Sequence, residues 1–161
     1  MENSAWLLKD TNGDYFAVRE VEMVEYVQIA NIFPVPATPR YCNHVMAWRD
    51  KLLPVVNIAL LFNMINKAKI NEVGVFAYQT AENTPLNHIA IPLSESPVHI
   101  IVNDNQFCDL PSRYSKDQRS LALSCFSYQD FSVPILNLNY LCSTEFRNNN
   151  YTQQIKMLAS G

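Results

Sequence analysis

A stretch of 17 residues occurs twice in this chain, and the repeat limits what the chain can fold into. Residues 45–61 read VMAWRDKLLPVVNIALL, and residues 125–141 read CFSYQDFSVPILNLNYL, 80 positions later. The two segments align without a gap and share four residues at equal spacing: Asp50 and Asp130, Pro54 and Pro134, Asn57 and Asn137, Leu61 and Leu141. Because the spacing is about half of the 161-residue chain, the repeat predicts two copies of one small unit.

Each copy of the repeat predicts two short strands followed by a short helix. The strands lie on either side of a polar turn, which is Arg49-Asp50 in the first copy. After the second strand the apolar residues recur at helical spacing, and an asparagine stands where a helix N-cap is favoured. We therefore expect short helices after Asn57 and Asn137.

The rest of the chain also predicts short strands. Residues 6–18 form a hairpin pattern around the turn residues 10–14, and residues 33–39 contain three prolines, which indicate an extended connector. Many short strands with such connectors favour small barrels or a sandwich. We expect an all-β domain with a first barrel over about residues 10–70. The second barrel would take about residues 71–145 plus the N-terminal strand, and 146–161 would form a tail.

The repeat also separates residues that serve the fold from residues that serve a partner. Residues present in both copies are assigned to the fold: Pro54 and Pro134 at strand edges, and Asn57 and Asn137 as helix caps. Arg49 is replaced by Gln129 in the second copy, and Trp48 by Tyr128. Arginine and tryptophan are enriched at protein interfaces, so Arg49 and Trp48 are candidate partner-binding residues. A core tryptophan and a solvated arginine are the alternative.

Composition excludes several classes of function. A net charge of −3 favours neither nucleic acid nor an anionic membrane as a partner. Only three glycines are present, so no glycine-rich phosphate loop can be written. The sequence shows no signal peptide and no apolar run of membrane-spanning length, which indicates a cytoplasmic protein. The four widely spaced cysteines are interpreted as reduced thiols, with a disulfide pair as the alternative.

Signals for catalysis are weak. The three histidines, His44, His88 and His99, lack metal-ligand spacing, and we expect no metal and no cofactor. Cys42 and His44 lie two residues apart, which leaves a Cys–His nucleophile pair open. With no further site signal, we interpret the protein as a non-enzyme.

The region from 33 to 62 resembles the CheW family, the coupling proteins of bacterial chemosensory arrays. The likeness rests on a proline-rich lead-in at 34–41, the Arg49-Asp50 turn and the segment Pro54-Val-Val-Asn-Ile58, with the upstream segment Val21-Glu-Met-Val-Glu25 as weaker support. The family usually has glycine where this chain has His44 and Asp50, and aspartate at Asn57. These departures indicate a divergent member, for instance one from a type IV pilus (twitching motility) chemosensory system.

This resemblance implies two SH3-like five-stranded barrels packed together and no catalysis. It implies an adaptor that binds the regulatory domain of a chemotaxis-type histidine kinase and the cytoplasmic tip of a methyl-accepting chemoreceptor, with the receptor helix in a groove between the barrels. Arg49 carries over from the family's coupling arginine, and Trp48, Glu25 and Val21 are further candidates for partner binding. The alternative is a generic β-barrel interaction module in pilus or secretion assembly.

Overall fold

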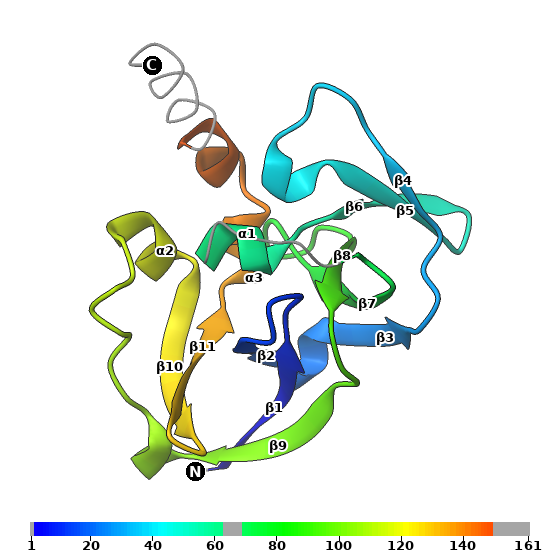
Figure 1. The fold of residues 1–161 in the computed structure, drawn as a ribbon. Coiled ribbons are helices and arrows are strands. Elements are labelled where there is room, and N and C mark those ends of the chain that lie inside the picture. The colour runs from blue at the N-terminus through cyan, green and yellow to red at the C-terminus, as the bar shows by residue number, and fades with distance from the viewer. Residues whose placement is uncertain (1, 63–68, 150–161) are drawn as a thin grey trace.

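The computed structural model describes residues 2–62 and 69–149, which form two β-sheets with short helices between them (Figure 1). The all-β prediction is therefore confirmed, as are the short helices after Asn57 and Asn137. The helical elements are η1 (Glu20–Glu22), η2 (Arg40–Cys42), α1 (Ile58–Phe62), η3 (Asp104–Gln106), α2 (Lys116–Ser120) and α3 (Leu138–Leu141). The tail expected at 146–161 lies outside the described residues from residue 150 onward.

The first sheet has five strands in the order β10-β11-β2-β1-β9. Its strands are β1 (Glu2–Lys9), β2 (Tyr15–Arg19), β9 (Val98–Asn103), β10 (Ala122–Tyr128) and β11 (Phe131–Leu136). Strands β1 and β2 form the expected N-terminal hairpin, and the Asp10 carboxylate closes it by accepting hydrogen bonds from the backbone N–H groups of Asn12 and Asp14. Strand β2 then meets β11 in parallel, where Ala17 pairs with Ile135.

The second sheet has six strands in the order β3-β7-β8-β6-β5-β4. Its strands are β3 (Met23–Val27), β4 (Ile32–Pro34), β5 (His44–Trp48), β6 (Lys51–Val55), β7 (Glu72–Tyr78) and β8 (Asn87–Leu93). Strand β4 is an addition to the expected five, formed by the start of the proline-rich connector. It lies at the sheet edge, where a proline removes no ladder hydrogen bond.

The two sheets share one pattern, which confirms two similar five-stranded units. Strands β5-β6-β8-β7-β3 follow the same order as β10-β11-β2-β1-β9, and the one parallel contact falls at the same place in each. The chain changes sheet between β2 and β3 and again between β8 and β9. A division near residue 70 therefore does not separate the sheets, because β7 and β8 pair in the six-stranded sheet and β2 pairs in the five-stranded sheet. Strand patterns in a sequence indicate strands, whereas pairing partners depend on tertiary contacts.

The repeated asparagines occupy equivalent positions before α1 and α3. The backbone N–H of Asn57 donates to the Tyr41 carbonyl at 2.7 Å, and that of Asn137 donates to the Leu121 carbonyl at 2.8 Å. The side-chain Oδ1 of Asn57 accepts from the Ala59 N–H at 3.1 Å, and that of Asn137 accepts from the Tyr140 N–H at 3.2 Å. Each asparagine thus joins the end of a strand to the first turn of a helix.

Replacing Asn57 with alanine is expected to lower the free energy of unfolding by about 2 kcal/mol, and the matched change Asn137→Ala by about 1 kcal/mol. The difference follows from burial, because Asn57 is 6% exposed and Ala59 is fully buried, so the Ala59 N–H would lose the Asn57 acceptor at a site away from water. Equilibrium unfolding in urea measures both values. Equal losses for the two variants would contradict the role of burial.

The turn of each repeat has a left-handed backbone without glycine. Trp48 pairs with Lys51 and Tyr128 pairs with Phe131, so each hairpin loop has two residues. The φ angles are 45° at Arg49, 62° at Asp50, 48° at Gln129 and 67° at Asp130. Two positive φ angles are typical of the type I′ turn, in which the second position favours glycine. The turn geometry is therefore kept at Asp50, although aspartate replaces the family's usual glycine.

Replacing Asp50 with glycine is expected to raise the free energy of unfolding by about 0.5–1 kcal/mol, because glycine adopts a positive φ without steric cost. Asp130→Gly should give a similar gain, since its φ is nearly the same. Thermal and urea unfolding of the two variants would test this. A loss of stability in both would mean that the aspartate side chains hold these turns.

The core has a shared part and two separate parts. The shared part combines Phe16 and Leu136 from the five-stranded sheet, Phe76 from the six-stranded sheet, and Ile58 and Leu138 from α1 and α3. In Figure 1 these two helices lie between the sheets. Smaller clusters fill each sheet, one around Met46 and Leu53 and the other around Phe126 and Val133. The two units therefore form one hydrophobic body.

Candidate functional site

Trp48 and Arg49 meet Glu25 at one end of the six-stranded sheet. Trp48 is buried, and its ring N–H donates to the Glu25 carboxylate at 2.5 Å. The Arg49 guanidinium lies 4.5 Å above the centre of the Trp48 ring and 3.6 Å from the same carboxylate oxygen. The His88 ring packs against Trp48 with ring centres 5.1 Å apart. We call these four residues the Glu25 cluster.

The Glu25 cluster forms because the six-stranded sheet is strongly curved. Glu25 is on β3 and Trp48 on β5, which lie four strands apart in the sheet order. In a flat sheet four steps would separate them by about 19 Å. The observed hydrogen bond requires β3 and β5 to curve toward each other, with His88 of β8 on the inner face between them. This curvature is typical of a small barrel.

The Glu25 cluster presents a positively charged group to solvent. The Arg49 side chain is 63% exposed, whereas Trp48 beneath it is buried. Burial lowers the pKa of His88, and the nearby Lys51 and Arg49 lower it further, so His88 is neutral near pH 7. A guanidinium has five N–H donors, and its contact with Glu25 leaves several of them directed to solvent. The cluster can therefore bind an acidic group on a partner.

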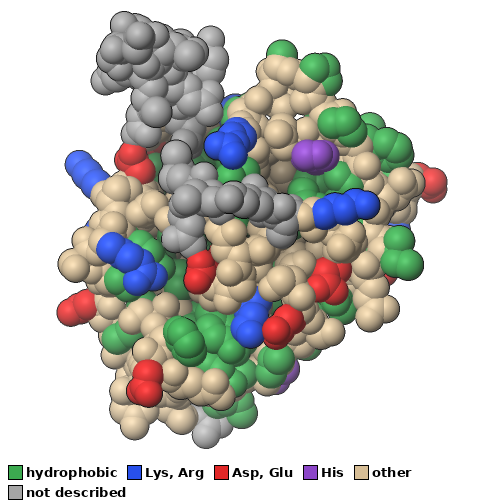
Figure 2. All heavy atoms as spheres, in the orientation of Figure 1, with side chains coloured by type: hydrophobic (Ala, Val, Ile, Leu, Met, Phe, Trp, Pro, Cys, Tyr) green, Lys and Arg blue, Asp and Glu red, His purple; other side chains and the backbone are tan. Residues whose placement is uncertain are grey.

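Charge elsewhere on the surface is mixed. On the face shown in Figure 2, Lys and Arg side chains are interspersed with Asp and Glu, and neither sign forms a continuous field. This distribution agrees with the small net charge. This face therefore presents local charged groups rather than a broad electrostatic patch.

A second candidate surface lies over the five-stranded sheet. It is an apolar groove of about 330 Å³, lined mainly by Ala5, Val21, Val102, Phe107, Leu123 and Ile135. Val21 is 83% exposed, Leu123 50% and Phe107 41%. Exposed apolar side chains gathered in a groove are typical of a protein-binding site. We call this surface the β10 groove.

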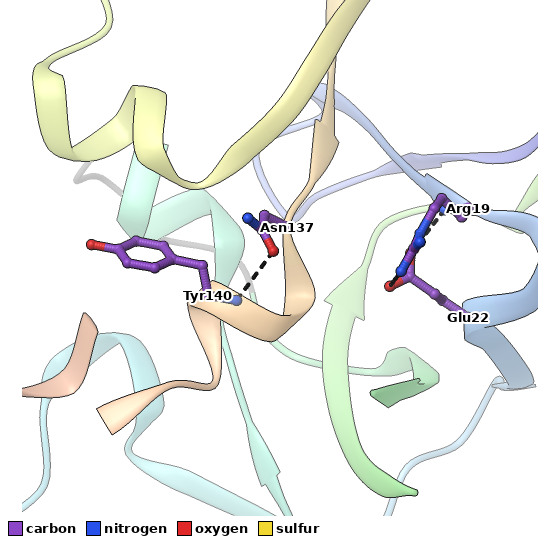
Figure 3. Close-up of polar contacts among 4 residues, drawn as sticks. All are labelled: Arg19, Glu22, Asn137 and Tyr140. Carbon is purple, nitrogen blue, oxygen red and sulfur yellow. Dashed lines mark hydrogen bonds and ion pairs between the residues drawn. The ribbon is translucent and has the colours of Figure 1, made fainter. Parts of the chain in front are cut away.

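Val21 is held in place by a polar clamp within η1. The Glu22 carboxylate is buried, accepts the Arg19 backbone N–H at 3.1 Å and forms an ion pair with the Arg19 guanidinium at 3.1 Å (Figure 3). Next to Val21 on the other side, Glu20 contacts the His99 ring at 2.9 Å. These contacts fix the short turn, which places the exposed Val21 among the residues that line the groove.

The structure brings together three of the four candidate partner-binding residues. Glu25, Trp48 and Arg49 are in contact, whereas Val21 belongs to the β10 groove on the other sheet. The groove that Val21 lines lies over the five-stranded sheet, and the groove expected between the barrels stays a prediction. Sequence reasoning missed Leu123, because a bulge between Ala122 and Ser124 breaks the strand alternation that would have assigned its face.

Signals for a catalytic or metal centre are weak in the described part of the chain. Within residues 2–62 and 69–149, His, Cys, Asp and Glu side chains form no group of three or more that could hold a metal ion. His44 of the proposed Cys–His pair has its Nδ1 2.7 Å from the Asn43 side-chain oxygen. In the same ranges no helix is both long enough and apolar enough to cross a membrane.

Comparisons with known proteins agree with this fold. The sequence model of the CheW-like domain family matches residues 6–108, which is more than half of the chain. The solved structure of the scaffolding protein TtCheW from Thermoanaerobacter tengcongensis superposes with a TM-score of 0.68 at 14% sequence identity. That likeness covers 91% of this chain and 96% of the other, and it shows a common fold of two SH3-like subdomains. No curated protein matches the sequence.

Proposed function

Since the chain belongs to the CheW-like domain family and so is a coupling adaptor of chemosensory signalling, we propose that it uses two separate surfaces to join a histidine kinase to a chemoreceptor. The kinase partner is its regulatory domain, and the receptor partner is the cytoplasmic tip. The adaptor would act in the cytoplasm, without catalysis and without a cofactor.

The separation of the two surfaces is the observation that supports this proposal. The Glu25 cluster belongs to the six-stranded sheet, and the β10 groove lies over the five-stranded sheet. A coupling protein needs such an arrangement, because two partners must be bound at the same time. A generic interaction module needs only one binding surface.

The chemistry of each surface favours one of the two partners. Chemoreceptor tips are helical, and an amphipathic helix can place its apolar side chains into a groove lined by Val21, Phe107 and Leu123. We assign the Glu25 cluster to the kinase domain, because Arg49 offers a rigid fork of donors that suits a carboxylate. Each contact alone would be weak, and an array would strengthen them through multivalency.

Calorimetric titration of the purified chain tests the proposal. We expect heat on adding the regulatory domain of the cognate kinase, and separately on adding the helical tip of the cognate receptor. A mixture of all three should co-elute, which shows that the two sites are filled together. The kinase's catalytic domain without its regulatory domain is the control. Absence of heat and of co-elution at high concentration would contradict the adaptor function.

The motility system remains part of the proposal. The departures at His44 and Asp50 fit a divergent adaptor of a type IV pilus system, with a flagellar system as the alternative. Titration with the regulatory domains of both kinds of kinase from the same organism would distinguish them. Tighter binding of the flagellar kinase would contradict the pilus assignment.

A further inference from the structure

Two cysteines face each other beside the β10 groove. The Sγ atoms of Cys108 and Cys125 lie 3.4 Å apart, and the backbone N–H of Cys108 donates to the Cys125 carbonyl at 2.9 Å. Their neighbours Phe107 and Phe126 form an isolated antiparallel bridge. Cys108 is exposed and Cys125 is buried, and both are free thiols in this structure. We propose that Cys108 and Cys125 form a reversible disulfide when the folded protein meets a peroxide.

The backbone arrangement already suits a disulfide. Residues directly opposite in a hydrogen-bonded antiparallel pair have Cα atoms about 5.5 Å apart, within the range that a disulfide spans. Closing the sulfur contact to a bond requires a movement of roughly 1.4 Å. Cys108 follows η3 in a segment with little regular structure, and β10 holds Cys125 firmly, so the segment around Cys108 can supply this movement.

The two thiols have different roles in the reaction. Cys108 is the sulfur that solvent reaches, and its thiolate attacks one oxygen of hydrogen peroxide. The O–O bond breaks, and Cys108 becomes a sulfenic acid as hydroxide leaves. The Cys125 sulfur then attacks the Cys108 sulfur, and the sulfenic oxygen leaves as water with the Cys125 proton. The protein loses two electrons and two protons in total, and the peroxide is reduced to water.

The environment of Cys125 supports this order of events. Burial, and next its contact with Cys108, raises the pKa of the Cys125 thiol to about 12, so it stays protonated and unreactive toward solvent oxidants. Its reaction depends on the short distance to Cys108 once that residue is oxidised. A reducing cytoplasm would return the pair to thiols, which is the behaviour of redox-responsive disulfides there.

Treatment of the folded, full-length protein with hydrogen peroxide tests the proposal. Free thiols are then blocked, and the protein is digested without reduction and examined by mass spectrometry. We expect a peptide that links Cys108 to Cys125, a loss of two hydrogen atoms from the protein, and two unblocked sites among the four cysteines. Dithiothreitol should reverse all three. The cross-link should also raise the melting temperature by roughly 5 °C, since it closes a loop of moderate length.

Matched variants test whether Cys108 and Cys125 are the two cysteines that become linked. Cys108→Ser changes an exposed residue and should remove the linked peptide and the rise in melting temperature. Cys142→Ser, in the same protein but outside this pair, should leave both unchanged. The proposal is wrong if peroxide leaves Cys108 and Cys125 unlinked in the folded protein. It is also wrong if the link forms only after unfolding in denaturant.

Discussion

Replacing Gly74 with alanine is expected to lower the free energy of unfolding by about 3 kcal/mol, which is the upper part of the range for overpacked cores. Gly74 lies in β7, two residues from Phe76 and so on the same face of the strand. A Cβ atom at Gly74 would lie 2.6 Å and 2.7 Å from two atoms of the Phe76 ring and 3.3 Å from the Leu93 Cδ1. The Phe76 ring is fully buried in the shared core and has no space to move aside.

Urea unfolding measures this loss, and a second glycine provides the control. Gly13 has no atom within 4 Å of an added Cβ, but its φ is 83°. Gly13→Ala should therefore cost only about 1 kcal/mol, from backbone strain alone. The double variant Gly74→Ala with Phe76→Leu should lose less than the two single changes together, because the smaller side chain removes the clash. A Gly74→Ala variant as stable as the Gly13→Ala variant would contradict the steric explanation.

The repeat made the local structure predictable, because its cues act over a few residues. The aspartate in each turn, the proline in each second strand and the asparagine before each helix indicated a hairpin followed by a helix, and both copies have that form. Even Leu121 and Tyr41, which accept bonds from the two asparagines, stand 80 positions apart. Local geometry follows from local sequence where the same pattern occurs twice.

Sheet membership was not predictable from the same cues. Strand β8 pairs in parallel with β6, and β2 pairs in parallel with β11, although each contact joins distant parts of the chain. These contacts depend on the shared core around Phe16 and Phe76, to which both halves of the chain contribute. A division of the sequence into a first and a second half therefore could not describe the two sheets.

The candidate site was predictable only in part, because some of its residues are marked by local sequence and others come together only in the fold. Trp48 and Arg49 are among the hairpin residues that the second copy lacks, and their residue types, which are enriched at protein interfaces, singled them out. Their contact with Glu25 depends on the curvature of a whole sheet, which no local pattern records. The β10 groove collects side chains from η1, β10 and the segment after η3, so only the folded chain shows it as one surface.

Changing one surface at a time should separate the two binding activities. Arg49→Ala is expected to weaken binding of the kinase regulatory domain by about 10-fold or more, as truncation of an arginine anchor does at an interface. Binding of the receptor tip should stay unchanged. Arg49 is 63% exposed, and Trp48 keeps its bond to Glu25 without it, so the melting temperature should change little. Gln129→Ala changes the same turn position in the second copy and should affect neither partner.

Leu123→Glu should weaken binding of the receptor tip and leave binding of the kinase regulatory domain unchanged. A carboxylate in the β10 groove would be desolvated by a bound helix, and we expect receptor-tip affinity to fall by roughly 100-fold while kinase binding persists. Leu123 is half exposed, so the fold should tolerate the change, and Leu86→Glu, at an exposed leucine outside the groove, is the control. Titration of each variant with each partner gives the four affinities needed. If Leu123→Glu and Arg49→Ala weaken the same partner, the two surfaces form one site, and the chain cannot couple receptor to kinase in the way proposed.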